Sequence, residues 1–213
     1  MFTPIQTETW KRREYFERYS KEIPCTYSLT STLDIFPIRR SGEKIYPAMI
    51  YLITQVVNRH EEFRISVNSN GVLGTYDKLH PCYTVFHEDT ETFSNIWTKF
   101  STNYADFRQD YEHDISIYGN IHGMNAKPNS PENCFPISMI PWVHFTGFQL
   151  NLQKGYNYFL PIFTMGQFYS NKEYILMPIS IQVHHAVCDG FHVSRFINEL
   201  QEAINIWNEP VAK

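Results

Sequence analysis

The stretch from residue 174 to residue 207 constrains the fold more than any other part of the sequence. Residues 174–183 are apolar on both faces of an extended strand, as expected for a strand in the middle of a covered sheet. The residues that follow place apolar side chains at helical spacing: Val193, Phe196, Ile197, Leu200, Ile204 and Trp207. A covered strand that leads into an amphipathic helix predicts a sheet with helices packed against it.

Sequence patterns elsewhere add further strands and helices to this unit. Alternation in a stretch rich in Thr, Ser and Leu predicts a strand at residues 26–35. Further strands are predicted at residues 63–67, 72–76, 82–87, 135–140, 143–152 and 158–168. Helical spacing predicts helices at residues 10–19, 47–58, 92–100, 104–118 and 191–207. The loop at residues 119–133 is too short and too central to be a domain linker. We therefore expect one α+β domain over residues 1–213, a two-layer sandwich with a large mixed β-sheet flanked by helices.

Composition limits the partners and the location that the chain can have. Eighteen Lys and Arg against 22 Asp and Glu give a formal charge of −4, which disfavours nucleic acid as a partner. The longest apolar run, residues 46–57, is shorter than the ~20 residues of a membrane span, and residues 1–20 lack the apolar core of a secretory signal. The four cysteines are widely separated. We expect a cytoplasmic protein with reduced thiols and no membrane contact.

The segment HHAVCDG, residues 184–190, concentrates polar chemistry in the turn between the apolar strand and the last helix. Histidine suits proton abstraction near neutral pH, because its unperturbed pKa is about 6.5. His185 is therefore a candidate general base, and Asp189 is a carboxylate four positions away. The glycine that follows permits a tight turn.

Three other interpretations of this segment remain open. Asp189 can cap the last helix beside two structural histidines. A metal site of His184, His185, Asp189 and His192 would need a distorted backbone, since adjacent strand residues point to opposite faces. Cys188 can be a thiol nucleophile, although a base alone is enough when the acyl donor is already a thioester.

The pattern HHxxxDG resembles the signature of CoA-dependent acyltransferases. The longer string QVHHAVCDGFH, residues 182–192, resembles the chloramphenicol acetyltransferases in particular. Six further strings resemble that family in family order: WKRREYF (10–16), PCTYS (24–28), YPAMIY (46–51), YTVFHEDTETFS (83–94), ISMIPW (137–142) and PIFTMG (161–166). The resemblance implies that residues 1–213 form one acyltransferase domain, which acetylates the primary hydroxyl of chloramphenicol and so confers resistance to it.

The resemblance also implies roles for individual residues. His185 would be the base in a ternary complex, with no acyl-enzyme and no permanently bound cofactor or metal. Ser138 would donate to the tetrahedral oxyanion, and Arg12 would pair with Asp189 to hold the turn. The implied chloramphenicol pocket consists of Tyr19, Ile23, Cys25, Tyr27, Phe93, Phe148, Leu150, Leu152, Ile162 and Thr164.

The co-substrate implied by the resemblance is acetyl-CoA, with Lys44, Trp142 and Phe168 beside it. Gln167 stands where many members of the family have a lysine, which removes a positive charge from the expected phosphate site. The resemblance also implies a trimer with active sites between subunits, most of the antibiotic pocket coming from one subunit and His185 from the next. Two alternatives remain: an acyltransferase of the same superfamily with another hydroxyl acceptor, and a non-catalytic protein that binds an aromatic ligand.

Overall fold

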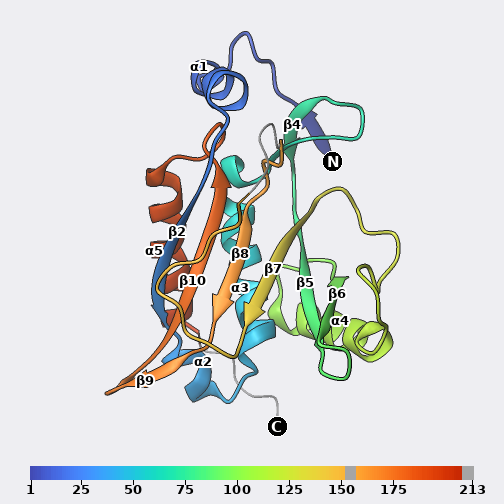
Figure 1. Ribbon diagram of the computed structural model, residues 1–213, viewed down its shortest axis with the longest axis vertical. Helices are drawn as coiled ribbons and strands as arrows, with labels where there is room; N and C mark the ends of the chain where they lie inside the picture. The colour runs from blue at the N-terminus through green and yellow to red at the C-terminus, as the bar shows by residue number, and fades with distance from the viewer. Residues whose placement is uncertain (152–156, 208–213) are drawn as a thin grey trace.

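A seven-stranded mixed sheet organises the part of the chain that the computed structural model describes, residues 1–151 and 157–207 (Figure 1). Its order is β2-β10-β8-β7-β5-β6, and β9 pairs with β10. The strands are β2 (Thr26–Asp34), β5 (His80–His87), β6 (Thr92–Trp97), β7 (Cys134–Ile140), β8 (Ile162–Gly166), β9 (Tyr169–Asn171) and β10 (Tyr174–His184). The β5–β7 and β7–β8 pairs are parallel and the other pairs are antiparallel. The predicted large mixed sheet with flanking helices is confirmed.

One face of this sheet is covered by helices, which lie behind it in Figure 1. They are α2 (Phe36–Ser41), α3 (Ile45–Arg59), α4 (Tyr104–Tyr118) and α5 (Gly190–Asn205). The predicted apolar stripe of α5 is buried at Val193, Phe196 and Leu200. Ile181 on β10 is also fully buried. The covered middle strand and the amphipathic helix thus form the main core.

A smaller sheet and two short helical segments lie near the N-terminus. The three-stranded sheet has the order β1-β4-β3, formed by β1 (Phe2–Pro4), β3 (Ile65–Val67) and β4 (Leu73–Tyr76). The helix predicted at residues 10–19 is shorter than expected. It is α1 (Arg13–Glu17), and the chain continues as a π-helical turn at Arg18–Glu22. A 3₁₀ turn at Glu61–Phe63 follows α3.

The strand predicted at residues 143–152 is wrong for its described part, residues 143–151. This segment runs irregularly across the sheet face opposite the helices, in front of the sheet in Figure 1, and we call it the crossing segment. Its backbone bonds side chains of the sheet: Ser180 Oγ donates to Phe148 O at 2.7 Å, and Leu150 N donates to Gln182 Oε1 at 2.7 Å. Gly166 permits the close passage, because a Cβ there would lie 2.8 Å from the Phe145 ring.

The helix predicted at residues 92–100 is also wrong, because these residues form β6 and the turn after it. The apolar residues Phe93, Ile96 and Phe100 have helical spacing. In the structure, however, Ser94 and Ile96 face the core while Phe93 and Asn95 face the opposite side of the sheet. Six ladder pairs with β5 decide between the two conformations.

Candidate functional site

The turn that joins β10 to α5 holds His185 at the end of the sheet. The His185 N–H donates to Cys25 O at 3.0 Å, which continues the pairing of β10 with β2 for one more residue. Asp189 then precedes the first turn of α5, and its N–H donates to His192 Nδ1 at 2.9 Å. Asp189 therefore serves as the helix N-cap, as one interpretation of the sequence proposed.

The imidazole of His185 is held with a defined tautomer. Its Nδ1 lies 3.3 Å from Cys188 O and 3.3 Å from Asp189 Oδ1. Both of these atoms are acceptors when Asp189 is ionised, so Nδ1 must carry the hydrogen. Nε2 then has a free lone pair, and within the described residues it makes no hydrogen bond. The His185 side chain is 31% exposed, so this nitrogen is open to a substrate.

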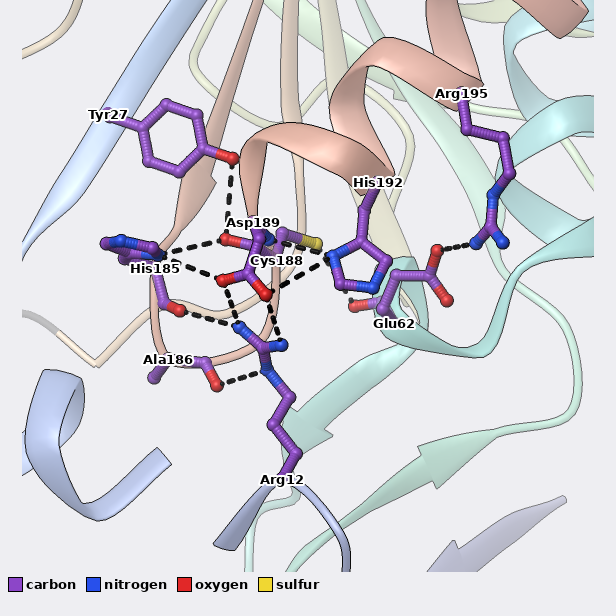
Figure 2. A network of polar contacts seen from close by, with 9 residues as sticks. All are labelled: Arg12, Tyr27, Glu62, His185, Ala186, Cys188, Asp189, His192 and Arg195. Atoms are coloured by element: carbon purple, nitrogen blue, oxygen red, sulfur yellow. Dashed lines mark hydrogen bonds and ion pairs between the residues drawn. The ribbon is translucent and has the colours of Figure 1, made fainter. Parts of the chain in front are cut away.

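Arg12 joins the N-terminal segment to this turn through four hydrogen bonds (Figure 2). Its Nη1 and Nη2 donate to the two oxygens of Asp189 at 2.8 and 2.6 Å. Its Nη2 and Nε also donate to His185 O at 3.0 Å and to Ala186 O at 2.9 Å. The planar guanidinium thus fixes the carboxylate and two carbonyls of the turn at once.

The electrostatics of the pair favour its charged form. The hydrogen bonds from Arg12 and then its charge outweigh burial and lower the pKa of Asp189 below its usual value. Burial opposes the charge of Arg12, but the hydrogen bonds and the charge of Asp189 outweigh it, and the pKa of Arg12 is raised. The carboxylate beside His185 Nδ1 is therefore ionised at neutral pH.

The other histidine and the cysteine of the motif lack the properties of a base or a nucleophile. His184 is 1% exposed, and burial followed by the proximity of His185 lowers its pKa to about 4. Its Nδ1 accepts from Ala186 N at 3.1 Å. Cys188 is also 1% exposed, and burial, followed by the charge of Glu62, raises its pKa well above the usual value. A buried neutral thiol argues against the nucleophile interpretation.

Aromatic residues of the implied pocket surround His185 within the same chain. The Tyr19 ring stacks on the imidazole at 4.0 Å, and the Tyr27 ring meets it edge-on at 5.5 Å. Cys25, Tyr27 and Leu150 line a neighbouring cavity of about 290 Å³. Ile23 is 50% exposed in the connection before β2.

Ser138 and Thr164 lie at another place on the same sheet face as the crossing segment. They are paired across β7 and β8, and their hydroxyls are 3.1 Å apart. Thr164 also pairs with Ser180, five residues before His185. Strand geometry then gives about 16 Å along β10 and about 10 Å across two strands, so Ser138 and His185 of one chain lie roughly 19 Å apart.

A cavity of about 550 Å³ opens beside Ser138. Phe93 and Trp142, two other residues implied by the resemblance, line it, and they are 47% and 60% exposed. The sequence did not single out Tyr46, which also lines this cavity and whose hydroxyl donates to Thr84 O at 3.1 Å. Because Tyr46 lies at the start of the apolar run at residues 46–57, nothing in the sequence marked it as a residue that lines a cavity.

The remaining implied residues have less defined surroundings. Ile162 pairs with Gln182, so it lies on the same sheet face as Thr164, and Phe148 belongs to the crossing segment. Lys44 is exposed before α3. Phe168 lies under the guanidinium of Arg39 at 5.5 Å, a contact that the sequence did not suggest. Leu152 lies outside the described residues.

The described residues contain neither a metal-binding cluster nor a membrane-spanning helix. Across residues 1–151 and 157–207, no three side chains of His, Cys, Asp or Glu come together in a way that could hold a metal ion. Of the helices in this part of the chain, none combines the length and apolar character that crossing a membrane requires.

Comparison with known proteins shows that the sequence is similar to one protein family over nearly its whole length. The family model described as "Chloramphenicol acetyltransferase" matches residues 1–201. Proteins of that name from Clostridium perfringens and Campylobacter coli are 56% and 54% identical, over 96% of this chain and 99% of theirs. Another protein of that name, from Staphylococcus aureus, is 46% identical over 96% of each chain.

Solved structures show the same fold at much lower identity. A chloramphenicol acetyltransferase superimposes with a TM-score of 0.80 at 21% identity, covering 96% of this chain and 100% of that one. A dihydrolipoamide acetyltransferase of Azotobacter vinelandii has a TM-score of 0.62 at 14% identity and covers 91% and 86%. The predicted fold class is therefore confirmed.

Proposed function

This chain belongs to the chloramphenicol acetyltransferase family, and from that premise we propose that it transfers the acetyl group of acetyl-CoA to the primary hydroxyl of chloramphenicol. Such a transfer confers resistance, because chloramphenicol that is acetylated at this hydroxyl no longer acts as an antibiotic. The observation that carries the proposal is the position of His185 Nδ1, which lies 3.3 Å from two acceptors, so that the hydrogen belongs on Nδ1 and Nε2 can act as a base.

The reaction needs only groups that the chain supplies. His185 Nε2 takes the proton of the hydroxyl as its oxygen attacks the acetyl carbonyl. The Ser138 hydroxyl donates to the oxyanion that develops, with Thr164 beside it. When the intermediate collapses, the CoA sulfur leaves and takes the proton back from His185. Arg12 and Asp189 hold the turn throughout and touch no substrate.

The separation of the two catalytic groups supports an active site shared between subunits. A base and an oxyanion donor that serve one acetyl group must both lie within about 3 Å of the reacting atoms. Strand geometry instead puts His185 and Ser138 of one chain roughly 19 Å apart. We therefore propose that His185 of one subunit meets Ser138 of the next, in the trimer that the resemblance implies.

The co-substrate proposal concerns the cavity beside Ser138. Acetyl-CoA would place its thioester there, with Trp142 against the pantetheine and Lys44 nearer the nucleotide. Phe168, whose ring lies under the Arg39 guanidinium, would also contact the co-substrate. Residues 1–213 act as one domain in this proposal, and the protein works in the cytoplasm, where acetyl-CoA is made.

A thiol-release assay tests the function. Purified protein with acetyl-CoA should release CoA thiol when chloramphenicol is added. It should not do so with an analogue whose primary hydroxyl is replaced by fluorine. Faster release with a different hydroxyl compound would favour an acyltransferase for another acceptor. If chloramphenicol binds but no hydroxyl compound gives thiol release, a non-catalytic binding protein is favoured.

Complementation tests the shared site. His185→Ala and Ser138→Ala chains should each be nearly inactive as homo-oligomers. When the two are co-expressed and mixed at random, about a quarter of the sites should receive both an intact base and an intact serine. Recovered activity supports sites between subunits. Mixed oligomers without activity would refute the shared arrangement.

A further inference from the structure

Beyond Val143, whose C=O accepts from Gln167 N at 2.9 Å, the backbone of the crossing segment is held by side chains and not by a sheet ladder. β10 is already paired with β2 on one side and with β8 on the other, so its backbone groups are used. A chain that passes over the face of this strand must therefore find other partners for its N–H and C=O groups. The partners are polar side chains at positions that would otherwise suit apolar residues.

Three side chains of two neighbouring strands supply these partners. Thr30 Oγ1 accepts from Phe148 N at 3.3 Å, and Ser180 Oγ donates to Phe148 O at 2.7 Å. Thr30 and Ser180 are direct ladder partners, so both ends of the Phe148 backbone are held at one level of the sheet. Two residues further on, Gln182 Oε1 accepts from Leu150 N at 2.7 Å.

The orientation of the Gln182 amide is fixed by its donors. Leu150 N and Ser28 Oγ, at 2.7 and 3.0 Å, both donate to the same side-chain atom, which must be the oxygen because a backbone N–H cannot accept. Nε2 is buried and finds no acceptor among the described residues. Gln182 is 5% exposed and Ser180 2% exposed, so these are buried polar groups whose use is to bind the crossing segment.

The segment they hold carries two residues of the implied chloramphenicol pocket. With its backbone bonded to the sheet, Phe148 keeps a half-buried side chain, and Leu150 is 41% exposed at the edge of the cavity near Cys25. We propose that Thr30, Ser180 and Gln182 are positioning residues that set the chloramphenicol side of the active site by holding residues 148–150. This inference rests on the proposed function.

Kinetics and hydrogen exchange test the proposal together. The double variant Thr30→Val, Ser180→Ala keeps the volume of the sheet face and removes both bonds to Phe148. The KM for chloramphenicol should rise roughly tenfold, about the worth of one to two net hydrogen bonds. The KM for acetyl-CoA should stay unchanged. Amide exchange in peptides that cover residues 143–151 should become faster without a comparable change in the core strands.

Matched variants exclude a general structural effect. Thr32→Val changes the same strand and face two residues away, where no side-chain hydrogen bond occurs among the described residues, and should leave exchange and both KM values unchanged. Thr30→Ser retains the hydroxyl and should keep the KM for chloramphenicol at its wild-type value. Equal rises in both KM values, or an unchanged KM for chloramphenicol with faster exchange, would overturn the proposal. If the wild type acetylates no chloramphenicol, the proposed function fails. If amide exchange of residues 143–151 is unchanged in the double variant, Thr30 and Ser180 do not hold the crossing segment, whatever the function is.

Discussion

Replacing Arg12 with valine should destabilise the protein and slow its reaction together. The change removes four hydrogen bonds and leaves the Asp189 carboxylate and two carbonyls without their donor. Loss of one partner of a buried ion pair costs about 3–5 kcal/mol. The Asp189 side chain is 36% exposed, so water recovers part of this, and we expect a loss of about 2–3 kcal/mol.

Two measurements check this magnitude. For a chain of this length, about 2–3 kcal/mol corresponds to a melting temperature roughly 4–12 °C lower. In this variant the carbonyl oxygen of His185 loses its donor, Arg12 Nη2, so the imidazole is held less firmly. We expect kcat to fall by about 10- to 100-fold, since displacing a catalytic group by about 1 Å can cost about 100-fold. Arg13→Val is the control, because within residues 1–151 and 157–207 the Arg13 side chain makes only an exposed ion pair, with Glu17.

A double-mutant cycle and a pH series decide whether the pair is the cause. Arg12→Val and Asp189→Asn together should lose at least about 1 kcal/mol less than the sum of the single variants. Because Arg12 lowers the folded pKa of Asp189, the stability from the pair is complete above the unfolded pKa of about 4 and is lost as the pH falls through the folded pKa. The difference in stability between the wild type and Arg12→Val should therefore shrink at acidic pH to the part that comes from the two carbonyl hydrogen bonds. Additive effects, or a difference that is as large below both pKa values as at neutral pH, would refute the reasoning.

Changes at four other residues have expected outcomes. His185→Ala should lower kcat by at least about 10²–10⁴-fold in the thiol-release assay, and an active His185→Ala beside an inactive but folded His184→Ala would reverse the assignment. Ser138→Ala should lower kcat by about 10²–10³-fold with little change in either KM, and an unchanged rate would move the role to Thr164. Gln167→Lys should lower the KM for acetyl-CoA by about two- to fivefold at low salt, an effect that should fade at high salt. Stability should also fall as the pH drops from about 6.5 toward 4, because the folded pKa of His184 is about 4 while the unfolded chain takes up the proton near 6.5. His184→Phe should make that slope less steep without abolishing it, since burial also lowers the pKa of His80 to about 4.

The parts of the fold that were predictable are those whose burial pattern is simple. The helix at residues 104–118 was predicted with the bounds that α4 has, because its apolar positions recur at one spacing and its ends carry clear signals. β10 extends one residue beyond its prediction, to His184. A helix was wrongly predicted at residues 92–100 because this strand has apolar residues on both faces. Phe93 faces the cavity and Ile96 faces the core, and their separation of three residues is also the spacing of a helix.

The site was predictable where chemistry is concentrated in sequence and not where it is spread over the sheet. His185 and Asp189 lie within one turn, so their relation was visible before the fold was known. Their link to Arg12 came only through the resemblance, and the structure then supplied its geometry. Ser180 and Gln182 gave no signal, because their partners are backbone atoms of a segment that sequence patterns assigned to a strand.

The position of β10 in the sheet has a consequence for the synthesis of the chain. Among the described residues β2 pairs only with β10, yet β2 ends at Asp34 and β10 begins at Tyr174. At a translation rate of about 5–20 residues per second, β2 waits on the order of ten seconds for its neighbour. Throughout that interval both of its edges lack partners, so a nascent chain is open to pairing with another copy. Resistance to aggregation on the ribosome is thus a demand that this topology places on β2, separate from any demand of catalysis.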